Sequence, residues 1–367
     1  MKGLMVIFIL AVFLAVPICS FGEDEKKEEV DWTKYAAITG LIDGRVTFYN
    51  FDPDAKNADS FRTSDVYIRF ASLGVEYTFN DYVGGSILVT AEDPDLFYLD
   101  HAYVKLQYPW VVTPSFTIGR VCVCRGSFAT YAIEYPFPQV LFESYMTAIG
   151  VGLEYPYFSY ETYFFNGKFD NVDKDGEPAD DIIDTVNMRL EVRPLAFQKD
   201  YQLNLGGMYL TDATETDFDL GSALLHDNYE KDVPLFGGFL TAVLPFTQMV
   251  GLGLIGEYAA TGKFNKNNYL DNSGKETTIS AYNLELALLL NDQTVQVGAK
   301  IEGINGVDWL GTQGFDPDYQ VERYARYGGF LGFDPWKCLH LGLRYLAGQD
   351  NEQNRDGEAM FQTLLTF

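Results

Sequence analysis

Histidine is the side chain that most often moves protons near neutral pH, and this chain has only three. His101, His226 and His340 lie far apart in the sequence. None of them belongs to a recognisable serine or aspartate constellation that would make a nucleophile with its base. We therefore expect no enzyme, and the sequence predicts neither a cofactor nor a metal centre.

An acidic motif in the middle of the chain has the spacing that begins a calcium loop. Its first ligand positions would be Asn171, Asp173 and Asp175, followed by Gly176. The twelfth position, however, is Ile182, where a bidentate glutamate is required. A plain acidic loop is the preferred interpretation, and calcium binding stays open as the alternative.

The charge balance is strongly acidic, with 52 Asp and Glu residues against 26 Lys and Arg residues and a formal net charge of -26. Phosphate binding needs clustered basic residues, so nucleic acid is not expected as a partner. The acidity gathers in turn-rich segments such as residues 93–95 and 170–184, which is typical of solvated loops.

Outside these loops, charged residues alternate with apolar ones, which is the period of a strand with two different environments. Residues 186–193 show the pattern, and residues 282–290 and 295–302 repeat it. In the first stretch, one face holds Val186, Met188, Leu190 and Val192, and the other holds Asn187, Arg189, Glu191 and Arg193.

About sixteen such strands are expected in antiparallel, up-and-down order. Tight turns near residues 80–81, 155–157, 245–247 and 291–292 alternate with long polar loops near residues 50–62, 169–181, 213–231, 262–276 and 305–319. Short turns on one rim and long loops on the other are typical of bacterial outer-membrane barrels. The predicted fold class is therefore an all-β, closed transmembrane barrel.

The C-terminus and the aromatic content favour the same fold. Aromatic residues make up 16% of the chain, which is high for a soluble domain. The chain ends at Phe367, and a terminal aromatic on an amphipathic last strand is the usual assembly signal of these barrels. Tyrosines near strand ends, such as Tyr77 and Tyr258, would form interfacial girdles. A soluble β-sandwich or β-helix is the alternative, but it would have to bury an apolar face on nearly every strand.

The N-terminus has the pattern of a secretory signal peptide. Basic Lys2 precedes an apolar stretch at residues 4–18, and the small residues Ser20 and Gly22 stand at cleavage spacing. Lipidation at Cys19 and an uncleaved helical anchor are the less favoured alternatives. The predicted organisation is a signal peptide over residues 1–22, a short charged segment over 23–35 and a barrel over 36–367. Because the first strand begins near Ile38, no plug domain is expected.

A sixteen-strand barrel is wide enough for an aqueous channel. Charged residues on the polar strand faces are predicted to line it, with both signs present, so that transverse fields would orient dipolar solutes. The alternative for any single residue is that it only faces water and pairs with a neighbour. The predicted pore-lining residues are Asp43, Arg45, Glu76, Lys105, Arg120, Glu154, Glu161, Arg189, Glu191, Arg193, Glu257, Glu285, Lys300, Glu302 and Arg344.

One long connection, from Gly126 to Glu143, is rich in aromatic and apolar residues where the neighbouring loops are acidic. Aromatic and apolar side chains are unfavourable in a loop exposed to solvent, so we expect this connection to fold into the barrel mouth as a constriction. Contact with another subunit is the alternative. The predicted constriction residues are Phe128, Tyr131, Glu134, Phe137 and Glu143.

Four short segments of the chain resemble the LbtU-type siderophore porins. They are residues 118–128, with Ile118-Gly119-Arg120 and Gly126-Ser127-Phe128; residues 148–167, with Phe165-Asn166-Gly167; residues 254–258, Leu-Ile-Gly-Glu-Tyr; and residues 38–42, Ile-Thr-Gly-Leu-Ile. The resemblance implies an outer-membrane barrel of about sixteen strands that admits iron-chelate siderophores without a plugged receptor.

The sequence thus predicts an outer-membrane porin-like channel for passive uptake of small solutes, with iron-siderophore chelates favoured by the resemblance. A general small-solute porin, and a structural or adhesive barrel with an occluded lumen, are the alternatives. The expected partners are outer-membrane lipid and lipopolysaccharide, a small-molecule solute and, as an open alternative, further copies of this chain in a homo-oligomer.

Overall fold

The fold lies in one of two compact units, Ala36–Phe367. The computed structural model describes residues 36–52, 60–92, 96–124, 126–127, 129–132, 136–166, 183, 185–198, 200–213, 233–265, 276–306, 323–350 and 355–367. The predicted signal peptide and charged segment, residues 1–35, lie outside the described residues.

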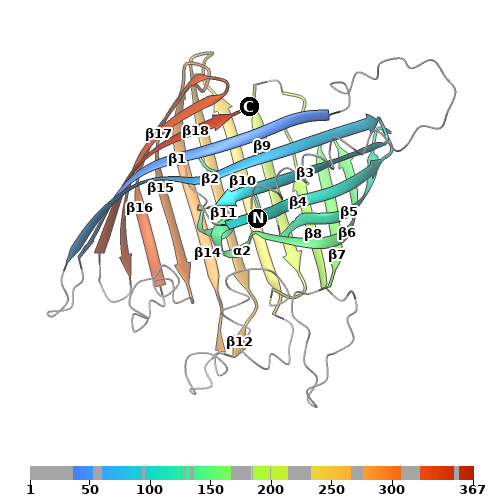
Figure 1. Cartoon of the computed structure of the whole chain (residues 1–367), viewed down its shortest axis with the longest axis horizontal. Helices are drawn as coiled ribbons and strands as arrows, with labels where there is room; N and C mark the ends of the chain where they lie inside the picture. The colour runs from blue at the N-terminus through green and yellow to red at the C-terminus, as the bar shows by residue number, and fades with distance from the viewer. Residues whose placement is uncertain are drawn as a thin grey trace, which may run out of the picture. The chain divides into compact units, whose positions relative to one another are not determined.

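Sixteen antiparallel strands form a closed barrel, as predicted (Figure 1). Each strand pairs with its neighbours in chain order, and the first strand closes the ring by pairing with the last. The barrel strands are β1 (Ala36–Asp52), β2 (Phe61–Asn80), β3 (Val83–Glu92), β4 (Leu96–Gln107), β5 (Thr113–Cys124), β6 (Ser144–Tyr155), β7 (Phe158–Phe165), β8 (Thr185–Val192), β9 (Gln202–Leu210), β10 (Leu235–Pro245), β11 (Val250–Thr261), β14 (Ser280–Leu290), β15 (Val295–Asn305), β16 (Arg323–Trp336), β17 (Leu339–Asp350) and β18 (Arg355–Thr366).

Two smaller features lie in the connections between barrel strands. The six-residue helix α2 (Phe137–Phe142) belongs to the connection between β5 and β6. The short strands β12 (Phe264–Asn265) and β13 (Glu276–Thr277) pair with each other between β11 and β14. Among the described residues, no helix has the length and hydropathy of a membrane-spanning helix.

Exposure alternates along the strands with the predicted period of two. On β14, Leu284, Leu286 and Leu288 are 49%, 49% and 41% exposed, whereas Glu285 between them is fully buried. Successive side chains of a strand point to opposite faces of the sheet. The outer surface of the barrel therefore carries the leucine row, and the charged row faces the interior.

The last residue of the chain lies at the seam where the barrel closes. The backbone N–H of Gly40 donates to the Phe367 carbonyl at 2.8 Å, and the Phe367 N–H donates back to Gly40 at 3.1 Å. A Cβ atom on Gly40 would lie 2.2 Å from the Phe367 ring, so only glycine leaves room for that ring. The terminal aromatic thus contacts the first strand directly.

Short and long connections follow the predicted asymmetry. The turn between β14 and β15 is tight, and Asn291 and Asp292 reach it with φ angles of 50° and 55°. The connections after β5, β7, β9, β11 and β15 are long and fall on the other rim, since neighbouring strands are antiparallel. Two connections on that rim are nevertheless short, at residues 93–95 and 351–354.

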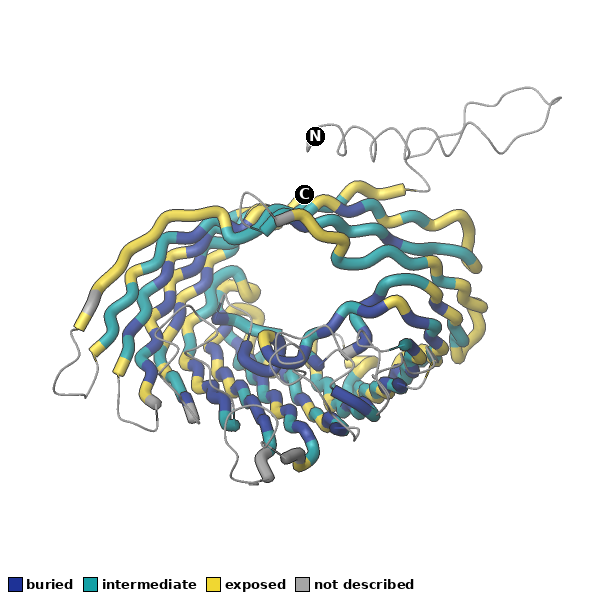
Figure 2. Tube along the Cα trace, turned by 60° about the horizontal axis from the view of Figure 1, so that its bottom comes forward, coloured by how far each residue is buried: buried dark blue, intermediate teal, exposed yellow. Residues whose placement is uncertain are grey.

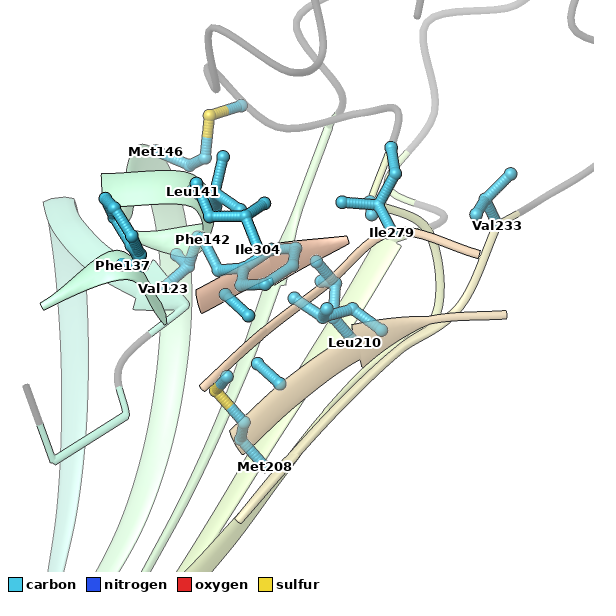
Figure 3. Close-up of a cluster of buried hydrophobic side chains, with 14 of the residues drawn as sticks. Val123, Phe137, Leu141, Phe142, Met146, Met208, Leu210, Val233, Ile279 and Ile304 are labelled. Atoms are coloured by element: carbon cyan, nitrogen blue, oxygen red, sulfur yellow. The ribbon is translucent and has the colours of Figure 1, made fainter. Parts of the chain in front are cut away.

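An apolar cluster occupies the interior beneath this rim (Figure 3). Phe137, Leu141 and Phe142 of α2 pack there with Val123 of β5 and Ile304 of β15. Figure 2 shows the buried trace of the β5–β6 connection within the ring of strands. This part of the interior is therefore filled by side chains of the connection rather than by charged groups.

Candidate functional site

Six charged side chains of alternating sign form a continuous row, here called the charge ladder, across the inner faces of β14 to β18. Antiparallel pairing places Glu285 opposite Lys300, and Glu302 opposite Arg326. The side chains of Glu285, Lys300 and Glu302 are fully buried. The successive contacts are Glu285–Lys300 at 3.3 Å, Lys300–Glu302 at 3.1 Å, Glu302–Arg326 at 2.6 Å, Arg326–Glu358 at 3.5 Å and Glu358–Arg344 at 3.0 Å.

A second buried ion pair lies next to the ladder at the barrel seam. Arg45 donates from Nε and Nη2 to one carboxylate oxygen of Asp43, at 3.0 and 2.7 Å. Gln362 of β18 donates to the other oxygen at 2.7 Å. Asp43 and Arg45 are 1% and 4% exposed, and the three residues join β1 to β18 on the inner face.

The carboxylates on three neighbouring strands also hold the connection between β5 and β6. Glu257 accepts a hydrogen bond from the Ser127 backbone N–H at 3.0 Å. Glu285 accepts from the Tyr131 N–H at 2.6 Å and from the Thr130 hydroxyl at 2.7 Å. Glu302 accepts from the Phe137 N–H at 3.2 Å. Hydrogen bonds to ionised acceptors are the stronger class, so the wall fixes this segment at three points.

Aromatic side chains add apolar contacts to this attachment. The Tyr131 ring stacks on Phe330 with 6.4 Å between centroids, and the Arg326 guanidinium lies 4.4 Å from the centroid of Phe137. A Cβ atom on Gly253 would meet the Tyr131 hydroxyl at 2.4 Å, so this glycine makes space for the ring. Burial raises the pKa of Tyr131, which therefore keeps its proton.

The other predicted constriction residues are placed only in part. Glu143 ends the segment and accepts hydrogen bonds from Gln139 at 2.9 Å and from the Tyr145 hydroxyl at 3.1 Å. Phe128 and Glu134 lie outside the described residues. The segment thus approaches the wall through Tyr131 and Phe137, while Glu143 ties it back to the start of β6.

A more exposed group of charges, here called the quartet, consists of Glu154, Arg189, Glu191 and Arg193. Arg189 contacts Glu191 at 2.5 Å, and Arg193 contacts both Glu191 at 3.1 Å and Glu154 at 2.6 Å. Their side chains are 15%, 15%, 28% and 53% exposed for Arg189, Glu191, Arg193 and Glu154. The quartet has no net charge, and two of its members, Arg189 and Glu191, line a cavity of about 360 Å³.

Three further residues predicted to line a pore fall on the inner face by their register. Glu76 pairs with Ser86, Lys105 with Thr117, and Glu161 with Arg189 of the quartet. Lys105, for example, stands between the exposed apolar residues Val104 and Leu106 on β4. Their position follows from the same alternation that places the ladder.

Arg120 was expected on the lumen side, and its strand places it on the opposite face. It shares that face with Phe116 and Ile118, which are 39% and 49% exposed, and its Nε donates to the Leu99 carbonyl at 2.8 Å. The inward positions on this part of β5 are Val121 and Val123, which pack under α2. The prediction assumed that every charge turns inward, but the alternation along β5 gives Arg120 the outer face, and the inward positions beside it are apolar.

Arg326 and Glu358 complete the ladder, and neither was among the predicted site residues. The signal that could have found them is the same alternation. Arg326 stands between Ala325 and Tyr327 of the outer face, and Glu358 shares its strand face with Met360. Sequence alone does not show which charges on different strands will meet, so their role depended on the register.

The described part of the chain contains no group of three or more residues that could hold a metal ion. The calcium-like motif at residues 171–182 and His226 lie outside the described residues. Of the other histidines, His101 hydrogen-bonds Ser86 at 3.0 Å and His340 contacts Asp334 at 2.6 Å.

No protein-family model matches the chain. No curated protein matches it either. Solved structures do match in fold. The Pseudomonas putida OprB structure at high pH has a TM-score of 0.61 and 11% identity, covering 95% of this chain and 100% of that one. An anion-selective porin from Comamonas acidovorans has a TM-score of 0.56 and 10% identity, covering 90% and 99%. The outer-membrane channel DcaP of Acinetobacter baumannii has a TM-score of 0.53 and 11% identity, covering 90% and 97%.

The chain therefore has the fold of an integral outer-membrane β-barrel of the porin type. The similarity spans nearly the whole length of each of these three structures, and at this level of identity it is a similarity of fold.

Proposed function

We propose that the chain is an outer-membrane channel through which small polar solutes diffuse passively. The observation that carries the proposal is the contrast between the two faces of the barrel wall. Large apolar side chains cover the outside, whereas the inner face carries paired charges, buried in the ladder and more exposed in the quartet. Charges facing lipid would be costly, whereas an aqueous interior suits them. Lipid and lipopolysaccharide would then contact the outer face, and residues 1–22 would direct export.

The segment that holds Tyr131 and Phe137 is proposed to act as the constriction. It is fixed by three carboxylates to one side of the inner wall, so it narrows the pathway without needing to move. The charges of the ladder would then stabilise the position of the segment, and the quartet would face the passing solute. Phe128 and Glu134 remain part of this proposal as predicted from the sequence.

The experiment is single-channel recording with the refolded mature chain in planar lipid bilayers. A channel gives discrete steps of current, and the current grows with salt concentration. Correctly inserted protein that leaves the bilayer silent would contradict the proposal. That result would favour a structural or adhesive barrel. The apolar packing around α2 inside the barrel is the observation that favours this second candidate.

Iron-siderophore chelates are the substrate class that the resemblance to LbtU-type porins suggests. Liposomes containing the protein would be followed by osmotic swelling, and the swelling rate in a ferric chelate would be compared with the rates in sugars and amino acids. Preferential entry of the chelate supports the assignment. Equal rates for all solutes would leave a general porin.

A homo-oligomer is also proposed. Among the solved structures similar in fold is one described as the trimer form of the outer-membrane protein OmpT of Vibrio cholerae, with a TM-score of 0.53 and 11% identity. Chemical cross-linking in native membranes tests it, and a single monomer band at full reaction would contradict it.

We propose transport and no catalytic activity for the chain.

A further inference from the structure

A cavity of about 360 Å³ is lined by Gly126, Ser127 and residues 129–131 of the β5–β6 connection and by residues of β8 to β11. We propose that it is a binding site for a small, uncharged, polyhydroxylated solute of the size of a monosaccharide. The inference rests on the proposed channel function, because it assigns a substrate class to the same pathway. Its support comes from the polar groups, the charge balance and the aromatic ring that line the cavity.

The polar lining suits hydroxyl groups. The Asn204 amide donates to the Thr241 hydroxyl at 3.1 Å, so an amide and a hydroxyl stand side by side on the wall. Gln202 adds a second amide. Arg189 and Glu191 of β8 also line the cavity, so charged groups stand next to these amides.

The charge balance favours a neutral solute. Arg189 is already paired with Glu191, and Glu191 is also paired with Arg193. An anionic solute would compete with Glu191 for Arg189, and a cationic one would compete with the arginines for Glu191. Breaking a partly buried pair leaves one charge without its partner, which opposes binding. A neutral solute can use the remaining hydrogen-bonding positions and leave the pairs intact.

An aromatic ring gives the cavity an apolar surface next to the polar one. Phe239 of β10 lies with its ring over Gly206, where a Cβ atom would be 2.0 Å from the ring, and the Arg189 guanidinium lies 5.1 Å from its centroid. Phe239 is 7% exposed, so it offers a small apolar surface to the carbon-bound hydrogens of a sugar while the hydroxyls reach the amides. The arrangement thus offers both surfaces that a polyol presents.

The size of the cavity limits which solutes it can hold. Ligand sites in proteins occupy about 300 to 1,000 Å³, and this cavity is near the lower end of that range. It suits one sugar ring and not a bulky iron chelate. An iron-siderophore passing the channel would therefore have to do so without entering this cavity.

The test is a titration of the channel current with glucose, with glycine, acetate and ethylammonium as charged or zwitterionic comparisons. We expect glucose to reduce the current in a saturable way and the three others to do so less. In Asn204→Leu and Thr241→Val, the glucose concentration for half-block should rise about tenfold, which corresponds to about 1.4 kcal/mol, the loss expected for one or two hydrogen bonds. Thr117→Val is the matched control, because Thr117 is a buried inward threonine on β5, away from the cavity.

Calorimetric titration of glucose into the detergent-solubilised chain measures the same site without a current. An open channel with no glucose block and no heat of binding overturns the inference and leaves the channel function standing. Equal weakening in Thr117→Val, or stronger binding of acetate or ethylammonium, also overturns it. A silent bilayer overturns the proposed channel, and the heat of glucose binding then decides the site on its own.

Discussion

The charge ladder and the quartet are both made of alternating acids and bases on the inner wall, yet they differ in burial and in what they contact. Glu285, Lys300 and Glu302 are fully buried, and two of them hold the backbone of the β5–β6 connection. The side chains of the quartet are 15% to 53% exposed, and two of them, Arg189 and Glu191, line a cavity. The same sequence pattern thus attaches a segment in one region, and in the other it forms the more exposed group that we propose to face the solute.

The largest effect is expected when the central cation of the ladder, Lys300, is removed. Lys300→Met keeps the length of the side chain but leaves Glu285 and Glu302 without their shared partner. Removing one partner of a buried pair costs about 3 to 5 kcal/mol, and we expect that loss in the free energy of unfolding. Urea unfolding in lipid micelles, followed by tryptophan fluorescence, measures it.

The control for this variant is Lys105→Met on β4. Lys105 also faces inward, but the described residues supply no ion pair for it. Its unfolding free energy should change by less than about 1 kcal/mol, as for exposed charges. Equal effects of the two substitutions would mean that the ladder contributes nothing beyond an ordinary inward charge.

The attachment of the β5–β6 connection is tested by Glu285→Gln. Tyr131 and Thr130 donate to different oxygens of the Glu285 carboxylate, so the single amide oxygen of glutamine can accept from only one of them, and that bond loses its charged acceptor. Hydrogen bonds to charged groups contribute about 1.5 to 3 kcal/mol, and we expect the connection to detach more often. Single-channel records should then show larger and noisier current steps.

Glu161→Gln serves as the control for that record, because Glu161 lies on the inner face of β7, opposite Arg189, and has no hydrogen bond to the connection among the described residues. Unchanged noise in Glu285→Gln, or the same increase in both variants, would argue against attachment by Glu285.

A smaller effect on stability, with a clear effect on selectivity, is expected from Arg189→Gln in the quartet. The substitution leaves the quartet with one net negative charge. Because the side chains are partly exposed, the unfolding free energy should fall by only about 1 kcal/mol. The reversal potential in a gradient of potassium chloride should shift toward cation selectivity. An unchanged reversal potential would mean that the quartet lies away from the ion pathway.

The smallest effect is expected from Arg193→Gln. Arg193 is 28% exposed, and its partner Glu154 is 53% exposed. Pairs of this kind contribute about 0.2 to 1 kcal/mol, so the midpoint of urea unfolding should barely change. A loss comparable to that of Lys300→Met would show that the quartet, like the ladder, is a structural network, and the contrast between the two regions would fail.

Much of the barrel could be read from the chain because the period of a strand is local. The alternation at residues 186–193 and 282–290 assigns each residue to a face without knowledge of its neighbours, and turns such as Asn291-Asp292 mark where each strand ends. The inward position of Glu285 and the outward position of Leu286 follow from that alone. The aromatic composition of residues 126–143 likewise indicated a segment that avoids solvent.

The failures have two causes. Arg120 was misplaced because its charge was taken to turn inward, although the alternation along β5 gives it the face of the exposed Phe116 and Ile118. Arg326 and Glu358 were overlooked because they belong to the ladder only through their ion pairs with Glu302 and Arg344, which lie on other strands.

The sequence by itself therefore determined the strands, their number and the face on which nearly every side chain lies, since these depend on periodicity and turn chemistry. Only the tertiary structure decided that Glu257, Glu285 and Glu302 converge on one connection and that Arg189 and Phe239 border one cavity. Those contacts depend on the register of antiparallel neighbours and on the closure of β1 onto β18. Both bring together residues that lie far apart in the sequence.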